Sequence, residues 1–203
     1  MAKEKLPRTD VTLGTVPGEL VRFSYFNLIT PRPDNFSKEV PAPLMYNAQL
    51  LVPKTNATDV KLVRDFVASM KKEVFTDKKK PVPANFWNPL RDGDTDTKEN
   101  GDSYGPAAAG HYVLTVKADA EHAPKVVGTQ KGEDGKLIRL TGGFKSGDYG
   151  RAGISLYGYE FKGKWGVGCG IRTAQLVQEG EALGSEADPD AEFGEFDNEG
   201  DVL

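Results

Sequence analysis

The segment that most constrains the fold is residues 153–177, GISLYGYEFKGKWGVGCGIRTAQLV. Two alternating runs, rich in β-branched and aromatic residues, meet at Lys162-Gly163, which is typical of a two-residue β-hairpin turn. Such a turn fixes the register, and a slip of one residue would move every side chain to the opposite face. The sequence therefore predicts a long antiparallel hairpin that orients the rest of the sheet.

The predicted register gives the hairpin two different faces. One face pairs Ile154 with Ile171 and Leu156 with Cys169, so it is an ordinary core face on which the cysteine is an inert packing residue. On the other face the expected pairs are Phe161 with Lys164, Tyr159 with Gly166, Tyr157 with Gly168, Ser155 with Gly170, and Gly153 with Arg172. Glycines weaken a strand that only has to pack, so these glycines need another explanation.

Two explanations fit this ring-bearing face. Exposed rings beside open backbone, with cations at the margins, suit a single-stranded nucleic acid, whose bases stack on rings while its phosphates meet the charges. Aromatic side chains also cover cross-strand glycines simply to repair a sheet. Both interpretations stay open on the hairpin alone.

The rest of the chain predicts mainly β structure with one helix. Strands are expected over residues 18–30, 44–52, 111–118, 125–130 and 136–140, after a loosely held arm over residues 1–17. Val60, Val63, Val67 and Met70 recur at helical spacing and predict an amphipathic helix over residues 59–75, capped by Thr58. With six or seven strands, a small OB-fold-like barrel is expected, and a jelly-roll-like sandwich is the alternative.

Two long loops carry further candidate residues. Residues 81–110 hold the pair Phe86-Trp87 near Arg91, which could clamp a base, although Phe86 and Trp87 could equally anchor the loop to the core. The glycine-rich residues 141–153 bring Lys145, Tyr149 and Arg151 to the start of the hairpin. The second loop therefore leads straight into the hairpin.

The formal net charge of −4 hides a strong asymmetry. Residues 186–203 hold eight acids and no Lys or Arg, whereas residues 1–185 carry 22 acids and 26 bases, a net of +4. The acidic stretch has too few apolar residues to offset the entropy cost of folding, so a disordered C-terminal tail is expected after a domain of residues 1–185. A basic body with an acidic tail suits regulated nucleic-acid binding, and acidic tails also serve solubility.

Other site classes find little support. Asp92, Asp94 and Asp96 have EF-hand spacing, but Thr97 replaces the required glycine and Ser103 the required glutamate. Two histidines and one cysteine disfavour a zinc site, and no spacing assembles a catalytic constellation, so no metal or cofactor and no catalysis are expected. No segment has the length and apolarity of a membrane span, and the first residues lack the apolar run of an export signal.

The chain resembles a family of bacteriophage single-stranded DNA-binding proteins. The resemblance extends over about residues 20–184 and is carried by YNAQLLVP at residues 46–53, NPLRDGD at residues 88–94, and the segment from Gly142 through YGYEFKGKWGVGCGI to Val177. It implies an OB-fold, coating of single strands in phage DNA replication and recombination, and no enzymatic activity. The acidic tail is also similar to tails of such proteins, but it ends in Asp201-Val202-Leu203 and not in phenylalanine.

These observations lead to a sequence-tolerant single-stranded DNA-binding protein, acting in the cytoplasm of an infected bacterial host. A structural phage accessory barrel and a hydrolase with an unrecognised carboxylate site are the alternatives. The residues assigned to DNA are Tyr157, Tyr159, Phe161, Tyr149 and Trp87 for stacking, and Lys145, Arg151, Lys164, Arg172, Arg91 and Lys117 for phosphates. The residues assigned to a partner such as a phage polymerase, helicase or primase are Phe193, Phe196, Asp197, Asp201, Val202 and Leu203.

Overall fold

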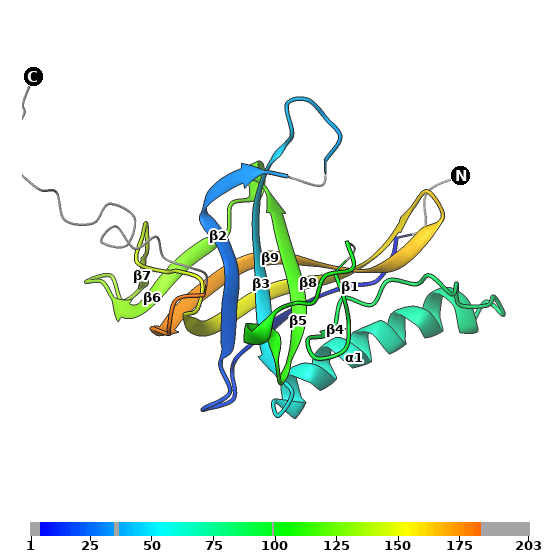
Figure 1. Cartoon of the computed structure of the whole chain (residues 1–203), viewed down its shortest axis with the longest axis horizontal. Coiled ribbons are helices and arrows are strands. Elements are labelled where there is room, and N and C mark those ends of the chain that lie inside the picture. Colours follow the sequence, from blue (N-terminus) through cyan, green and yellow to red (C-terminus); the bar gives the residue numbers. More distant parts are fainter. Residues whose placement is uncertain (1–4, 35–36, 99, 184–203) are drawn as a thin grey trace, which may run out of the picture.

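The computed structural model describes residues 5–34, 37–98 and 100–183, and Figure 1 shows a mainly β protein with one long helix. The strands are β1 Arg8–Leu13, β2 Val21–Pro33, β3 Leu44–Pro53, β4 Arg91–Asp92, β5 His111–Asp119, β6 Lys125–Lys131, β7 Leu137–Arg139, β8 Tyr149–Phe161 and β9 Lys164–Gln178. The described residues thus form nine strands where six or seven were predicted. The difference is β1 and the two-residue β4, which the sequence pattern did not reveal.

Five of the strands close into a barrel in the order β2, β3, β5, β9, β8 and back to β2. The closure is short, because β8 meets β2 through Val21 opposite Gly150 and Arg22 opposite Tyr149. The β5–β9 pair is parallel, with Lys117 opposite Gly170, whereas the other four pairs are antiparallel. A closed five-stranded barrel of this kind confirms the predicted OB-fold class.

The barrel interior is filled by one side of each strand. Phe23, Leu50, Leu114, Ile154 and Leu156 have no exposed surface, and each stands at alternating positions with outward-facing neighbours. Burying such a side chain is worth about 1.5 to 3 kcal/mol, so this alternation fixes which face of each strand looks outward. The hairpin's outer face is therefore exposed toward its turn, at Tyr157 and Phe161, whereas Ser155 on the same face is buried.

Helix α1, Ala57–Lys71, covers part of this core and continues into a π-helical turn, Lys72–Thr76. It packs against β1 and β8, and Figure 1 shows it on the side from which the β8–β9 hairpin projects. The predicted cap was wrong: the Oδ1 atom of Asn56, and not Thr58, accepts the Asp59 backbone N–H at 3.0 Å. No helix in the described ranges is both long enough and apolar enough to cross a membrane.

Two segments expected to be loops are strands. Residues 8–13, placed in a loose arm, form β1 and pair with β8 from Arg8 opposite Tyr157 to Leu13 opposite Ala152. Only Leu13 of this strand is buried, so its pattern carried almost no hydrophobic signal. In the glycine-rich segment, β8 already begins at Tyr149 and not after Gly153.

The predicted hairpin register is confirmed from Phe161 opposite Lys164 down to Ile154 opposite Ile171. It fails at the next pair, where Gly153 stands opposite Thr173 and not opposite Arg172. Arg172 is therefore an extra residue in β9, as in a β-bulge, which bends the strand and increases its twist. The ring-bearing face ends at this bulge.

Candidate nucleic-acid interface

The outer face of the barrel carries a polar row that crosses five strands. Successive paired residues are Asn27 of β2, Asn47 of β3, Lys117 of β5, Gly170 of β9 and Ser155 of β8. OB-folds bind oligonucleotides on this face of their second and third strands, which here are β3 and β5, and on the loops between strands one and two and strands four and five. In this chain the loop between strands four and five is the turn of the β8–β9 hairpin, at Lys162-Gly163.

Aromatic rings stand beside this row on β8. Tyr157 is 38% exposed, and its ring lies across Gly168, where a Cβ atom would come 2.6 Å from the ring Cζ. Tyr159 is half-buried, with its hydroxyl 3.0 Å from the place of a Gly166 Cβ, and Phe161 is largely exposed near the turn. The contact of Tyr157 with Gly168 fits both explanations of the ring, base stacking and sheet repair.

Trp87 joins the same face from the long loop. Its backbone pairs with β9, because its N–H donates to the Trp165 carbonyl at 2.8 Å and its carbonyl accepts the Val167 N–H at 3.1 Å. A Cβ at Gly166 would lie only 2.5 Å from the Trp87 Cβ. Gly166 is therefore a glycine because another chain segment crosses it, and Trp87, 37% exposed, is brought next to Tyr159.

The loop that carries Trp87 is held by a cluster of charges. The Nζ of Lys54 lies 2.6 Å from Asp92 and 2.7 Å from Asp94, and these hydrogen bonds lower the pKa of both carboxyls. The same bonds raise the pKa of Lys54 to about 12. Two of the three aspartates with EF-hand spacing, Asp92 and Asp94, are thus engaged by an ammonium group, which ties β4 to the end of β3.

Arg91 transmits this anchoring to Trp87. Its guanidinium carbon lies 5.2 Å from the centre of the Trp87 ring, within the range of a cation–π contact, and its Nε lies 3.3 Å from Asp96. Of the residues that were predicted to clamp a base, Trp87 and Arg91 are therefore stacked on one another. Phe86 instead packs against the core, as the alternative interpretation expected. A base would have to use the ring face that Arg91 leaves open.

The predicted cations differ in how they are engaged. Lys117 points outward from β5 with its Nζ 3.4 Å from Asp34, and Arg172 lies 3.3 Å from Asp10. Asp10 also accepts a hydrogen bond from the Ser155 hydroxyl, so β1 contributes a carboxylate to this face. Exposed pairs of this kind are worth at most about 1 kcal/mol and can be exchanged for phosphate contacts.

Two predicted residues lie at the far end of β8. Tyr149 is half-buried, has the Arg22 guanidinium 5.3 Å from its ring centre, and contacts Gly180. Lys145 lies 3.3 Å from the buried Asp148. The strand rises about 3.3 Å per residue, which places Tyr149 about 40 Å along the strand from Phe161.

The remaining predicted cations, Lys164 and Arg151, are exposed on β9 and β8. Lys164 stands opposite Phe161, beside the ring cluster of Tyr157, Tyr159 and Phe161, whereas Arg151 lies two residues from Tyr149 at the far end of β8. The roles of all these residues in binding stay predictions. The tail residues Phe193, Phe196, Asp197, Asp201, Val202 and Leu203 lie outside the described residues.

Sequence reasoning missed the polar side chains of the two central strands. Asn47 and Gln49 of β3, and Thr115 of β5, face outward between the ring cluster and β2. Their signal was the alternation of YNAQLLV, in which Ala48 and Leu50 mark the inner face. They are neutral hydrogen-bonding groups at the centre of the face that OB-folds use.

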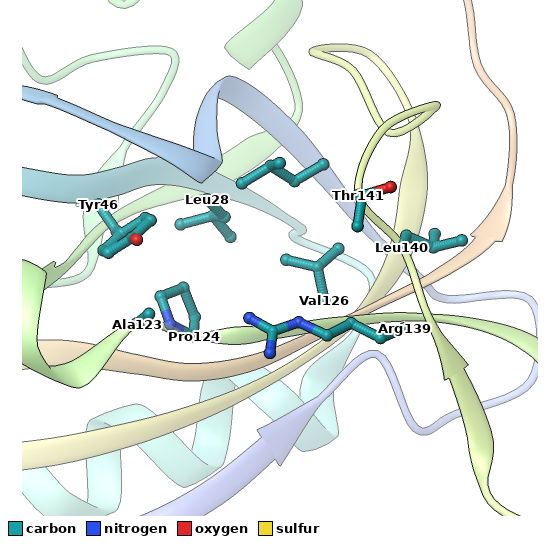
Figure 2. A pocket seen from close by; sticks show the side chains of 9 residues that line it. Leu28, Tyr46, Ala123, Pro124, Val126, Arg139, Leu140 and Thr141 are labelled. Carbon is teal, nitrogen blue, oxygen red and sulfur yellow. The ribbon is translucent and has the colours of Figure 1, made fainter.

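A separate hollow opens at the end of the barrel near β6 and β7. It has a volume of about 280 Å³ and includes the core-facing Leu28 and Val126 in its lining. Figure 2 shows the Arg139 side chain extending along it toward Pro124. Its residues come from the barrel end and not from the polar row, so it is distinct from the ring-bearing face.

The closed five-stranded barrel, with aromatic rings and cations on its outer face, places the protein in the OB-fold class. Members of this class bind oligonucleotides and oligosaccharides on that face. The chain belongs to the family of the Enterobacter phage Enc34 single-stranded-DNA-binding protein, whose family model matches residues 10–203. No curated protein sequence matches the chain.

Solved structures give the same picture of the fold. The single-stranded DNA-binding protein of bacteriophage Enc34 in complex with ssDNA has a TM-score of 0.62 at 18% identity, over 86% of this chain and 89% of that one. The bacteriophage T7 single-stranded DNA-binding protein gp2.5 has a TM-score of 0.57 at 16% identity, over 97% and 100% of the two chains. At this identity the likeness establishes a shared fold, and the family assignment comes from the sequence match.

Proposed function

We propose that this protein binds single-stranded DNA without strong sequence preference, and that it coats and protects single strands in phage DNA replication, recombination and repair. The observation that carries the proposal is the gathering of Tyr157, Tyr159 and Trp87 on the barrel face that OB-folds use. Membership of a phage single-stranded-DNA-binding family supports it. The proposed activity is binding and not catalysis.

The proposed mechanism divides the work between rings and charges. Each base has a π-face, so stacking on tyrosine or tryptophan is worth about 1 to 3 kcal/mol whatever the base. Lys117, Lys164 and Arg172 lie around the rings and would meet phosphates, in two cases in exchange for an aspartate. Neither base stacking nor phosphate contacts depend on the identity of the base. A face made of rings and cations should therefore bind single strands of any sequence.

Fluorescence anisotropy with one labelled oligonucleotide, as a single strand and as a duplex, tests the proposal. Tighter binding of the single strand is expected, with log affinity falling against log salt by about 0.7 per phosphate neutralised. A mixed-sequence strand and a homopolymer should bind with similar Kd. Salt-independent binding, or a preference for the duplex, would contradict the proposed function.

The acidic tail is proposed to regulate this binding. Residues 186–203 bring eight negative charges to a body of net charge +4, and a short tether holds a second group at an effective concentration in the millimolar range. The tail would then compete with the DNA backbone for the same cations. Phe193, Phe196, Val202 and Leu203 would offer apolar anchors to a phage polymerase, helicase or primase in the cytoplasm of the infected host.

Comparison of the full chain with residues 1–185 tests the tail. The truncated protein should bind single strands more tightly, with the gain largest at low salt, because ions screen the tail at high salt. A reconstituted replication reaction should nevertheless be supported less well by the truncated protein. Equal or weaker binding by residues 1–185 at low salt would exclude a competing tail.

A further inference from the structure

Tyr25 has a backbone conformation that is unusual for a residue inside a strand. Its φ is +49°, in the left-handed region that side chains with a Cβ rarely adopt. Two other non-glycine residues of the described chain share this region, Lys79 and Lys162, and both lie in turns. An aromatic residue held there within β2 is strained, and such strain often accompanies a functional role.

The strained residue changes which side chains of β2 face outward. Val21 and Phe23 are buried at alternate positions, so an unbroken strand would also bury Tyr25. Instead the register shifts after Ser24, and Tyr25 is 56% exposed. Phe26 takes the inward place, stacked on Phe144 with ring centres 4.2 Å apart. The bulge thus exchanges one ring for another and leaves the first in solvent.

Hydrogen bonds fix the bulge on both sides. The Phe26 N–H donates to the Ser146 hydroxyl at 2.9 Å, from the loop before β8. The Asn27 side-chain amide donates to the Tyr25 carbonyl at 3.1 Å and to the Asn47 side chain at 3.0 Å. A β-bulge can change the direction in which one side chain points. Here the bulge turns Tyr25 outward, two residues from Asn27 of the polar row.

The Tyr25 ring stands at the opposite margin of the face from Tyr157. Four strand spacings of about 4.8 Å separate β2 from β8 through β3, β5 and β9, which is about 19 Å along the sheet. The Nζ of Lys98 lies 5.8 Å from the centre of the Tyr25 ring. A ring and a cation together resemble the arrangement around Trp87 and Arg91 on the other side.

We propose that Tyr25 is a further base-stacking residue, which receives a nucleotide at the β2 margin of the interface while Lys98 meets its phosphate. The inference rests on the proposed function, since it needs single-stranded DNA on this face. Packing does not account for the ring, because it is mostly exposed and its place in the core is taken by Phe26. Asparagine or glycine would adopt the same backbone with less strain.

The decisive variant is Tyr25→Asn, because asparagine tolerates the left-handed conformation and lacks the ring. Loss of one stacked base should raise the Kd for single strands by about 5- to 140-fold. The Tm should stay the same or rise, because backbone strain is reduced. Affinity and stability would then move in opposite directions, which a residue with a purely structural role would not produce. Tyr25→Phe is the matched control that keeps the ring and should bind like the wild type.

A photocrosslink supplies an independent readout. An oligonucleotide with iodouracil at single positions, irradiated with the wild-type protein, should yield a crosslinked peptide that contains Tyr25. Wild-type binding together with an unchanged Kd for Tyr25→Asn would overturn this inference and leave the proposed function standing. Failure of the wild-type protein to bind single strands would instead overturn the proposed function.

Discussion

Gly170 offers the sharpest test of whether the glycines of β9 serve a ligand. A Cβ at Gly168 would lie 2.6 Å from the Tyr157 ring, and one at Gly166 would lie 2.5 Å from Trp87, so both glycines are explained by protein contacts. At Gly170 the nearest atoms, one of them the Lys117 carbonyl oxygen, would be 3.8 Å away, an ordinary van der Waals contact. The fold therefore accepts alanine at position 170.

The expected effects of Gly170→Ala on stability and on binding have opposite signs. Alanine in place of a strand glycine gains about 0.5 to 1 kcal/mol in folding free energy, which raises the Tm by about 1 to 4 °C for a chain of this size. The new methyl group stands about 1.5 Å above the strand, in the middle of the polar row. If a nucleotide rests there, about 1 kcal/mol of binding is lost, or roughly a fivefold rise in Kd.

The assay is anisotropy with a single-stranded oligonucleotide, combined with calorimetric Tm on the same samples. Gly142→Ala is the matched control, because its Cβ would meet no atom within 4 Å and the residue lies in the loop before β8. It should bind as the wild type does. Gly168→Ala should weaken binding by displacing Tyr157. Wild-type affinity in Gly170→Ala would refute the idea that nucleic acid approaches β9 closely at this residue.

Three further predictions concern the tyrosines of the interface, the loop that carries Trp87, and the start of helix α1. Tyr157→Ala and Tyr159→Ala should each weaken single-strand binding by about 1 to 3 kcal/mol, whereas a lowered Tm at unchanged Kd would assign the tyrosines to sheet repair. Lys54→Met should lower thermal stability and single-strand affinity together near neutral pH, by freeing the loop that carries Trp87. Lys54 lowers the pKa values of Asp92 and Asp94 in the folded protein. The difference in stability between the wild type and Lys54→Met should therefore be full above about pH 4, the carboxyl pKa in the unfolded chain. It should vanish as the pH falls through the lowered pKa values of the folded protein. Burial raises the pKa of Asp59, so wild-type stability should fall as pH rises through that raised value, and Asp59→Asn should lack this fall in pH-dependent melting curves.

The hairpin register could be predicted because one short turn and a period of two determine it together. From Phe161 to Ile154 every pair follows from counting outward from Lys162-Gly163. The prediction failed at Arg172, where a bulge adds a residue among side chains that are small or exposed. Unbroken alternation from Ile171 would have turned Ala174 and Leu176 outward, whereas both pack on the core side. These two apolar residues were therefore a trace of the bulge, which counting outward from the turn did not use.

The strands β1 and β4 were missed for a related reason. β1 is held by backbone pairing with β8 and buries only Leu13, and β4 pairs through two residues, Arg91 and Asp92. Backbone hydrogen bonds are available to any residue except proline, so they leave little trace in composition. The spacing of Asp92 and Asp94 was visible in the sequence, but their partner Lys54 is distant in the chain and emerges only in the fold.

The glycines of β9 show which contacts of the candidate interface could be predicted from the sequence and which could not. Tyr157 with Gly168 belongs to one hairpin, so that contact could be predicted, whereas Trp87 reaches Gly166 from a loop almost eighty residues away. The two glycines look alike in the sequence, yet one accommodates a neighbouring ring and the other a crossing backbone. Gly170 alone of the three has no protein group that excludes a Cβ. The inference that nucleic acid approaches the backbone of β9 therefore depends on Gly170, and on the exposed ring of Tyr25, more than on the number of glycines.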